Sequence, residues 1–389
     1  MTQHNTDIAI IGGGASGLAA AIAAARHGAA VVILEKLPRV GKKLLATGNG
    51  RCNLGNLSRD SAHYAGSVNA EPILTKFQGE EAFFRSLGLV ALPDEAGRLY
   101  PASGQAASVL DALRLECARL GVVEVCDFQV TEAAPRRGEQ CSPVFHLRSK
   151  TGDTITAKRV ILAAGGAAGP QYGTDGAGFK LAKSLGHQVT ARYPALGPIS
   201  VDSQRIRALK GLRVQARVTA LKDGQSIHAE EGQVQFAEGA LSGICVFNLS
   251  ARRPDELALD LLPWCDDAAG LLSEITKVRA DVPPEDMLTG LFPKRIGQVL
   301  LKEAAEKPLA ELVKDWRFPA LSNINWEAAQ VTAGGVSGIL PTLESPGVPG
   351  FYFAGEILDV HGDTGGFNLR WAWASGYFVG TEAARRLKR

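Results

Sequence analysis

The feature that most constrains this chain is a glycine-rich stretch close to its start, DIAIIGGGASG at residues 7–17. Residues 8–11 are all apolar and predict a buried parallel strand, and the Ala-rich pattern of residues 18–27 predicts a helix. Three glycines between them have the G-x-G-x-x-G spacing, namely Gly12, Gly14 and Gly17. A strand, a glycine turn and a helix in this order are the fingerprint of a dinucleotide-binding Rossmann unit.

Each of the three glycines has a physical task in such a unit. Gly12 allows a tight turn, Gly14 lets the backbone approach a pyrophosphate, and Gly17 lets the helix pack on the strand. The helix N-terminus offers N–H groups to the phosphates. Glu35 ends the next apolar run, residues 30–34. It comes about 20 residues after the glycines, where an acidic side chain accepts hydrogen bonds from the ribose hydroxyls.

Two other interpretations of this stretch are a glycine loop without a ligand and a membrane helix. Residues 8–25 carry no charge and are about long enough to span a bilayer. Three consecutive glycines and the change from a strand to a helix pattern argue against a membrane helix.

The whole chain has 46% hydrophobic and 21% charged residues and a formal net charge of +2. These values are typical of a globular protein and favour neither a nucleic acid nor a membrane as partner.

The cysteines indicate a reducing environment. The six are Cys52, Cys117, Cys126, Cys141, Cys245 and Cys265. They form no C-x-x-C pair and no metal-ligand spacing, so we expect reduced thiols, no metal site and a cytoplasmic protein. No basic segment with a cleavage site precedes the first strand, so we expect no signal peptide.

The 389 residues are enough for two or three domains, and their pattern predicts an α/β fold with an insertion. Strand patterns at residues 122–130, 143–149 and 154–158 predict an antiparallel meander added to the parallel sheet, and residues 67–87 predict a helix. Alternating residues and the turn signal Asp223-Gly224 predict an antiparallel, barrel-like domain within the chain. The expected domains are a Rossmann-type domain at 1–188 and 332–389, a barrel-like domain at 189–262 and 320–331, and a small helical subdomain at 263–319.

The end of the chain contains a second motif. Residues 351–354 predict a last core strand, Gly355 and Glu356 follow it directly, and residues 365–368 begin the last helix. Ligands of open parallel sheets bind beyond the carboxyl ends of the strands, and a helix N-terminus there stabilises negative charge on a reduced flavin. Both ends of the chain would thus bind one cofactor. This favours FAD, with its long ribityl chain, over NAD as the tightly bound group.

Several stretches together resemble one family. They are the fingerprint with Glu35, GNGRCN at residues 48–53, AGG at 164–166, TAGGV at 332–336, and FAGE at 353–356 with GGFN at 365–368. They resemble the HI0933-like (BaiN-type) flavoproteins, which are NAD(P)/FAD-dependent oxidoreductases, and the resemblance covers almost the whole chain. It implies an FAD-binding Rossmann domain built from both chain ends, an inserted β-barrel domain and a small helical bundle. One branch of the family looks like reductases of enones such as oxidised bile acids.

The residues assigned to the cofactor come from the fingerprint, from the glycine- and lysine-rich loop at 36–53, and from the other motifs. They are Gly12, Gly14, Ala15, Ser16, Gly17, Glu35, Lys36, Lys42, Lys43, Gly48, Arg51, Cys52, Asn53, Val130, Gly165, Gly355, Glu356, Gly366, Asn368 and Leu369. For the loop at 36–53, a surface loop without a ligand is the alternative.

Catalytic residues are marked less clearly. His361 and Asp363 lie in the loop before the last helix, near the expected flavin edge, where a general acid for a reduced carbon would sit. A solvated loop histidine is the alternative. Cys52 is a candidate redox thiol, with a packed small residue as the alternative. Arg51 is a candidate partner for a phosphate or a substrate anion, with a structural salt bridge as the alternative.

The sequence therefore predicts an FAD-dependent oxidoreductase that moves hydride between NAD(P)H and a small organic substrate, with an enone C=C as one option. The alternatives are a flavin oxidase that uses O₂ and a flavin-carrying sensor or RNA-associated protein without turnover. We expect the substrate to bind between the Rossmann-type domain and the insertion. No second fingerprint locates an NAD(P)H site, and the oligomeric state is left open.

Overall fold

The computed structural model describes residues 4–137, 143–305, 307–321 and 325–387. They form two compact units, one made of Met1–Tyr193 with Val331–Arg389 and the other of Pro194–Gln330. The expected limits of the Rossmann-type domain were residues 188 and 332. The helices of the middle segment belong to the second unit and form no third one.

A seven-stranded sheet forms the centre of the first unit, with the order β7-β2-β1-β10-β9-β8 and with β19 paired to β10. β1 pairs parallel with β2 and with β10, and β19 is parallel to the end of β10. The bounds are β1 (His4–Ile11), β2 (Val31–Leu34), β7 (Val123–Val125), β8 (Val130–Arg137), β9 (Pro143–Ser149), β10 (Thr154–Leu162) and β19 (Phe351–Phe353). The α/β fold with a parallel sheet is confirmed.

The antiparallel part of this sheet differs in detail from the prediction. The predicted strand 154–158 is the first half of β10. Lys158 does not end the strand, because β1 pairs with β10 on both sides of it, with Thr6 opposite Ala157 and Ile8 opposite Arg159. The predicted strand 122–130 is wrong. Its start is β7, which pairs parallel with β2, and Asp127 turns the chain with a φ of 55° before β8 begins. An antiparallel meander β8-β9-β10 is present as expected, but its first strand is β8 (Val130–Arg137) in place of the predicted 122–130.

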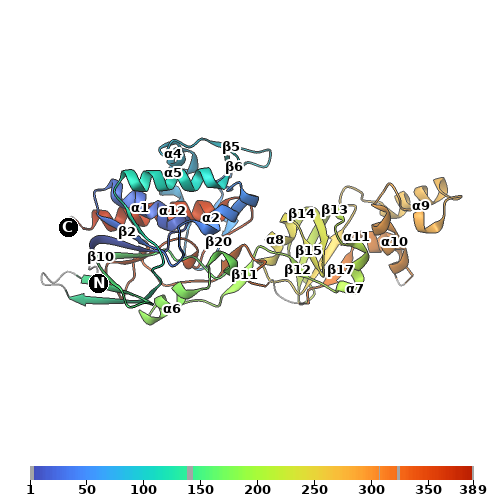
Figure 1. Cartoon of the computed structure of the whole chain (residues 1–389). Helices are drawn as coiled ribbons and strands as arrows, with labels where there is room; N and C mark the ends of the chain where they lie inside the picture. Colours follow the sequence, from blue (N-terminus) through green and yellow to red (C-terminus); the bar gives the residue numbers. More distant parts are fainter. Residues whose placement is uncertain (1–3, 138–142, 306, 322–324, 388–389) are drawn as a thin grey trace. The chain divides into compact units, whose positions relative to one another are not determined.

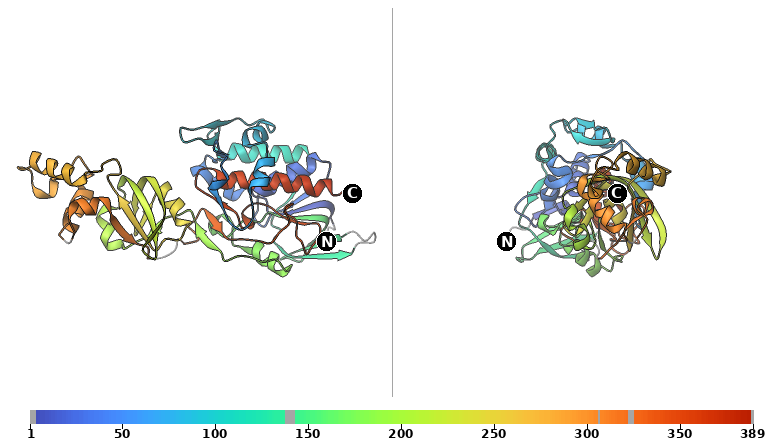
Figure 2. Two further views of the ribbon diagram at one scale, coloured as in Figure 1. Left: turned by 180° about the vertical axis from the view of Figure 1, so that it is seen from behind. Right: turned by 90° about the vertical axis from the view of Figure 1, so that its right-hand side faces the viewer.

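Helices cover both faces of this sheet (Figures 1 and 2). α1 (Ala15–Arg26) and α12 (Phe367–Arg385) lie side by side on one face, and α6 (Ala177–Ser184) lies on the other. α1 and α12 come close because glycines face the neighbouring backbone. A Cβ on Gly380 would lie only 2.2 Å from the carbonyl oxygen of Ala20.

Short elements connect these layers. The predicted helix 67–87 is two helices, α3 (Glu71–Lys76) and α4 (Glu80–Arg85), separated at Gly79, whose φ of 101° a helix cannot continue. The other bounds in this unit are α2 (Lys42–Ala46), η1 (Thr47–Gly50), β3 (Gly55–Asn56), η2 (Ser61–His63), β4 (Tyr64–Ala65), β5 (Ala91–Pro93), β6 (Arg98–Pro101), α5 (Ala106–Arg119), η3 (Pro170–Tyr172), β18 (Val331–Ala333), η6 (Gly355–Ile357) and β20 (His361–Gly362). β11 (Tyr193–Ala195) pairs with β18.

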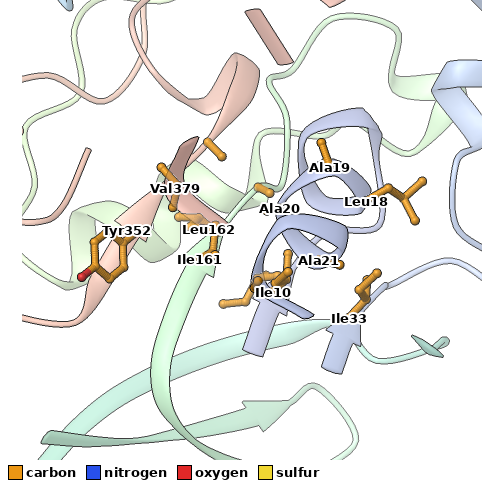
Figure 3. Close-up of a cluster of buried hydrophobic side chains, with 14 of the residues drawn as sticks. Ile10, Leu18, Ala19, Ala20, Ala21, Ile33, Ile161, Leu162, Tyr352 and Val379 are labelled. Carbon is orange, nitrogen blue, oxygen red and sulfur yellow. The ribbon is translucent and has the colours of Figure 1, made fainter. Parts of the chain in front are cut away.

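The core of the first unit lies between the sheet and α1. Figure 3 shows Ile10 of β1 and Ile33 of β2 next to Ala21 of α1, and all three residues are fully buried. Burying such a large aliphatic side chain contributes about 1.5–3 kcal/mol to folding. Small alanines let α1 lie close to the strands. The packing therefore fixes the N-terminus of α1 at the end of β1, where the predicted site lies.

The second unit is built on a six-stranded antiparallel sheet with the order β12-β15-β14-β13-β16-β17. β12 and β17 are the two ends of this order, and Leu321 N, just after β17, donates a backbone hydrogen bond to Ser200 O of β12 at 2.9 Å. Asp223 and Gly224, with φ of 51° and 75°, form the predicted hairpin turn between β13 and β14. The bounds are β12 (Ile199–Ser200), β13 (Arg213–Lys222), β14 (Gln225–Ala237), β15 (Ala240–Ser242), β16 (Glu256–Asp260) and β17 (Trp316–Pro319).

The helices of the second unit share one core with its sheet. Ile296 and Leu300 of α10 are buried in the same cluster as Trp316 and Phe318 of β17. The predicted helical segment 263–319 therefore ends in a strand, since the buried and exposed residues of β17 alternate beside β16. The bounds are α7 (Ser203–Ile206), η4 (Arg207–Leu209), α8 (Ile244–Ser250), α9 (Ala268–Val278), η5 (Pro284–Asp286), α10 (Lys294–Glu303) and α11 (Leu309–Lys314).

Two further observations concern the described residues only. None of their helices combines the length and the hydropathy that crossing a bilayer requires. Five of the six cysteines are free thiols, namely Cys52, Cys117, Cys126, Cys245 and Cys265. Cys141 lies outside the described residues.

Candidate functional site

The glycine turn between β1 and α1 is tight at two of its three glycines and open at the third. Gly12 has a φ of 107°, and a Cβ there would lie 2.5 Å from the carbonyl oxygen of Ala163. A Cβ on Gly17 would lie 1.9 Å from the carbonyl oxygen of Gly12, so the helix and the turn touch. A Cβ on Gly14 would meet no atom within 4 Å. Gly12 and Gly17 are thus required by packing, whereas Gly14 borders open space at the N-terminus of α1.

Glu35 lies at the end of β2 with its carboxylate fixed by the backbone. Its Oε2 accepts a hydrogen bond from Gly13 N at 2.8 Å, and its Oε1 accepts one from Leu37 N at 2.9 Å. Phe128 N donates to the carbonyl oxygen of Glu35 at 2.8 Å, so the segment before Val130 lies beside the end of β2. A carboxylate has about four acceptor positions, so both oxygens can still accept hydrogen bonds from ribose hydroxyls.

The three predicted lysines differ in what they contact. Lys36 Nζ lies 2.7 Å from Asp175 Oδ1, and Lys43 Nζ lies 2.9 Å from Glu356 Oε2. Lys42 is exposed. The positive charges of Lys36 and Lys43 therefore already have carboxylate partners in the protein.

Glu356 joins three segments at the carboxyl end of the sheet. Besides its pair with Lys43, its Oε1 accepts a hydrogen bond from Thr332 N at 2.9 Å. Thr332 Oγ1 in turn accepts a hydrogen bond from Ala167 N at 2.7 Å. A Cβ on Gly166 would lie 2.2 Å from that hydroxyl oxygen. β18 and the loops after β10 and β19 are thus held together, with Gly165 turning the loop after β10 at a φ of 70°.

Gly355 marks the place where the two chain ends meet. It has a φ of 77°, and a Cβ there would lie 2.5 Å from Ser16 Oγ on α1. Its N–H donates to Ser375 Oγ at 2.9 Å, and its carbonyl oxygen accepts from Trp371 Nε1 at 3.1 Å. The polar groups of the Gly355 backbone therefore bond to α12.

The loop at 48–53 contacts the N-terminus of α12. The Asn53 amide, with its nitrogen toward Gly55 O at 2.9 Å, accepts a hydrogen bond from Gly366 N at 3.0 Å. Gly48 has a φ of 57°, and the exposed Arg51 guanidinium lies 4.2 Å from the centre of the Tyr100 ring. In the structure, Arg51 is therefore stacked on an aromatic ring.

Cys52 is packed inside this loop. Its side chain is fully buried, and burial raises the pKa of the thiol to about 12. A thiol of that pKa is almost entirely protonated at neutral pH, and the thiolate is the nucleophile in cysteine chemistry. The structure therefore favours the packing role of Cys52 over the redox role.

The start of α12 is fixed from two sides. A Cβ on Gly366 would lie 2.2 Å from Gly55 O, so only glycine fits there. The Asn368 amide bonds both to Gly362 N and to Gly362 O, each at 2.8 Å, and Leu369 is half-buried. Asn368 thus binds the protein's own loop.

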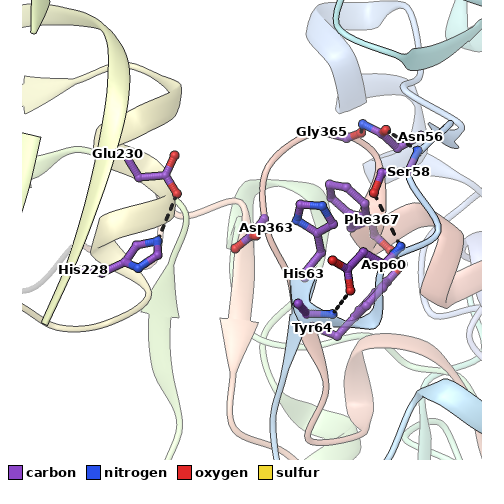
Figure 4. A network of polar contacts seen from close by, with 12 residues as sticks. Asn56, Ser58, Asp60, His63, Tyr64, His228, Glu230, Asp363, Gly365 and Phe367 are labelled. Atoms are coloured by element: carbon purple, nitrogen blue, oxygen red, sulfur yellow. Dashed lines mark hydrogen bonds and ion pairs between the residues drawn. The ribbon is translucent and has the colours of Figure 1, made fainter. Parts of the chain in front are cut away.

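Of the two candidate general acids, Asp363 has the clearer partner. His63 Nδ1 lies 3.0 Å from Asp363 Oδ2, and the two side chains are 35% and 29% exposed (Figure 4). His361, in β20, is only 8% exposed. Sequence reasoning missed His63, because it lies 300 positions from Asp363 and no local pattern marks it.

A buried ion pair holds the next segment on α12. Arg370 Nε lies 2.5 Å from Glu80 Oε1, and the two residues are 3% and 0% exposed. Arg370 also donates to the carbonyl oxygens of Ser58 and Asn56. No local pattern marks this pair, since Glu80 falls in a stretch with a helical pattern and Arg370 lies 290 positions away.

These residues fit a bound dinucleotide. The open space beside Gly14 lies at a helix N-terminus, which favours a phosphate. The fixed carboxylate of Glu35 lies at the end of the neighbouring strand, where a ribose is bound in such units. Residues from both ends of the chain meet around this edge of the sheet, as an FAD site would need.

Comparison with known proteins agrees with this site. A family described as HI0933-like protein Rossmann domain matches residues 6–382. The chain is 38% identical to the 3-dehydro-bile acid delta(4,6)-reductase of Clostridium scindens, over 97% of this chain and 99% of that protein. It is 27% identical to the ribosomal RNA dihydrouridine synthase of Haemophilus influenzae, over 99% of this chain and 100% of that protein.

Two solved structures show the same fold. The 3-ketosteroid-delta4-(5alpha)-dehydrogenase of Rhodococcus jostii RHA1 has a TM-score of 0.51 and 18% identity, covering 99% of this chain and 98% of its own. A flavocytochrome c3 fumarate reductase has a TM-score of 0.52 and 17% identity, covering 98% of this chain and 78% of its own. The chain is an FAD-dependent oxidoreductase, and it belongs to the HI0933-like Rossmann-domain family.

Proposed function

We propose that this protein reduces a carbon–carbon double bond conjugated to a carbonyl group in a small organic molecule, with NAD(P)H as the hydride donor. The observation that carries the proposal is the 38% identity, over nearly the whole length of both chains, to a reductase whose substrate is a 3-dehydro bile acid. FAD, when bound, would accept two electrons as hydride and pass them to the substrate.

The chain's own residues would hold and orient the cofactor. The N–H groups of the first turn of α1, beside Gly14, would bind the pyrophosphate. Glu35 would accept hydrogen bonds from the ribose hydroxyls. The N-terminus of α12, beside Gly366, would stabilise negative charge on the ring. Fixed dipoles of this kind need no rearrangement during the reaction.

A second candidate substrate is a uridine in ribosomal RNA. It is favoured by the 27% identity to the dihydrouridine synthases of Haemophilus influenzae and Escherichia coli. Formation of dihydrouridine also saturates a ring double bond next to a carbonyl, so the chemistry would be the same. The second unit carries 16 Lys and Arg against 19 Asp and Glu. Proteins that bind RNA through its phosphates usually carry an excess of basic residues, so we favour the small molecule.

The free thiols of the described cysteines support a reducing, cytoplasmic location, where NAD(P)H is available. We propose a small-molecule substrate as the partner, with no nucleic acid and no membrane beyond the candidate substrates named above, and the oligomeric state is open. The expected position of the substrate between the Rossmann-type domain and the insertion stays a prediction.

The test is anaerobic oxidation of NADH and of NADPH by the purified protein, followed by absorbance. The acceptors are a conjugated bile-acid enone, cyclohexenone and ribosomal RNA, and the saturated bile-acid ketone is the matched control. We expect oxidation with an enone and none with the saturated ketone. Turnover with RNA alone would favour the second candidate. Peroxide formation in air with no turnover on any organic acceptor would favour an oxidase and refute the proposal.

A further inference from the structure

Two short strands bring a histidine and an aspartate together in the first unit. β4 and β20 pair antiparallel, with Gly362 opposite Tyr64. The next residues along this register are His63 and Asp363, and side chains opposite each other in an antiparallel pair lie on the same face. Asp363 N donates to His63 O at 2.9 Å, and His63 Nδ1 lies 3.0 Å from Asp363 Oδ2. Backbone and side chains thus both join the pair.

The pair is held against the first turn of α12. The His63 ring stacks on the Phe367 ring with centroids 4.0 Å apart and planes 21° apart. Tyr64 OH donates to the carbonyl oxygen of Phe367 at 3.1 Å. The Asn368 amide binds Gly362, the residue before the aspartate, at both its N and its O. Figure 4 shows His63 between Phe367 and the aspartate. The histidine therefore has a fixed position at the helix end to which we assign the flavin ring.

Both side chains are accessible as well as fixed. His63 is 35% exposed and Asp363 is 29% exposed at the side chain. Part of the histidine ring therefore faces solvent, and we assign the transferred proton to Nε2, the ring nitrogen on the far side from the bond that Nδ1 makes with Asp363. A pair this exposed contributes little to stability, so variants of it are expected to fold.

We propose that His63 is the proton donor for the reduced carbon of the substrate and that Asp363 positions it. This inference rests on the proposed reduction of a conjugated double bond. One carbon of the bond would receive the hydride that the bound cofactor supplies. The proton of His63 Nε2–H goes to the other carbon, next to the carbonyl. The N–H bond breaks as the new C–H bond forms with the electron pair of the double bond, and solvent returns a proton to Nε2.

Asp363 has two effects on this donor. Because Nδ1–H donates to the carboxylate before and after the transfer, the proton that leaves is the one on Nε2. The carboxylate also stabilises the positive charge that the ring carries before it donates. Asp363→Asn keeps an acceptor oxygen for Nδ1–H but removes the negative charge, so it should weaken the donor less than loss of the ring does.

The test separates the two halves of the reaction by stopped-flow absorbance in wild type and His63→Gln. One half is reduction of the bound flavin by NAD(P)H, and the other is its reoxidation by the conjugated bile-acid enone. Loss of a general acid slows its step by about 10²–10⁴-fold. We therefore expect reoxidation by the enone to fall about a hundredfold or more, with flavin reduction, the FAD dissociation constant and the melting temperature unchanged. Added imidazole should restore part of the rate of His63→Ala.

His27→Gln is the matched control. His27 Nδ1 also lies 2.9 Å from an acceptor, Ala23 O, but it follows the last residue of α1, at the opposite end from the glycine turn. Both half-reactions should be unchanged in this variant. The inference is overturned if His63→Gln is reoxidised by the enone as fast as wild type. A parallel fall of both half-reactions and of FAD affinity would show a structural role and also overturn it. If wild type itself reduces no enone, the proposed function fails, and the inference fails with it.

Discussion

Gly14 and Gly17 belong to one motif, but alanine should act on them in opposite ways. At Gly14 the backbone has a φ of −83° and a ψ of −168°, which any residue adopts, and a Cβ would meet no atom within 4 Å. Gly14→Ala should therefore leave the protein without cofactor as stable as wild type or more so, by about 0.4–1 kcal/mol, because alanine restricts the unfolded chain. The added methyl group would instead occupy the space that we assign to the pyrophosphate.

The expected loss of FAD affinity follows from the hydrogen bonds at that place. A pyrophosphate pushed away by a methyl group would lose at least one bond to a helix N–H, and a hydrogen bond to a charged group contributes about 1.5–3 kcal/mol. The dissociation constant for FAD should therefore rise by about ten- to a hundredfold in Gly14→Ala.

In Gly17→Ala the new Cβ would lie 1.9 Å from Gly12 O, so α1 would have to move. Overpacking of this kind costs about 1–3 kcal/mol of stability.

The assay measures two quantities on each variant prepared without FAD. The melting temperature reports stability, and quenching of FAD fluorescence on titration reports affinity. We expect Gly14→Ala to lose affinity without losing stability, and Gly17→Ala to melt several degrees lower. If Gly14→Ala bound FAD with unchanged affinity, the pyrophosphate would not lie at the N-terminus of α1, and the position that we assign to the cofactor would be wrong.

Three other variants test further parts of the site and fold. Glu35→Ala should weaken FAD binding by about ten- to a hundredfold, and an unchanged dissociation constant would place the ribose elsewhere. Cys52→Ala should retain turnover within about twofold, because a buried thiol with a pKa of about 12 supplies no thiolate, and a complete loss with normal folding would support a redox role. Glu116 has its pKa lowered to about 2 by hydrogen bonds from Arg119 and Arg26. Because the pKa of Glu116 is lowered in the folded protein, its carboxylate stabilises the fold fully at pH values above the usual pKa of 4.5. This contribution is lost as the pH falls through about 2. Glu116→Gln should therefore lower the melting temperature at neutral pH, with the difference from wild type vanishing in strong acid.

The fingerprint could be predicted from the sequence because its physics is local. The tasks of Gly12 and Gly17 depend on atoms a few residues away in the chain or on the strand next to it. Glu35 directly follows the apolar run that forms β2. For the same reason the hairpin at Asp223-Gly224 was predictable, since two residues with positive φ are enough to form it.

The remaining errors of the prediction come from contacts that no short pattern contains. Lys158 looks like the end of a strand, but β1 pairs with β10 on both sides of it. Glu80 lies in a stretch with a helical pattern, yet it is completely buried against Arg370. In each case the outcome depends on a segment far away in the sequence. The pair of His63 and Asp363 escaped prediction for the same reason.

The hydrogen bonds of the site indicate which groups remain for the cofactor. The Gly355 N–H donates to Ser375, and the Gly366 N–H donates to Asn53. Both glycines are therefore needed for their conformation and for close approach, rather than as donors to a ligand. The first N–H groups of a helix, by contrast, have no partner within the helix. The first turns of α1 after Gly14 and of α12 after Gly366 are thus the places where we expect backbone donors for negative charge, whereas Gly355 and Gly366 themselves hold the chain ends together beside them.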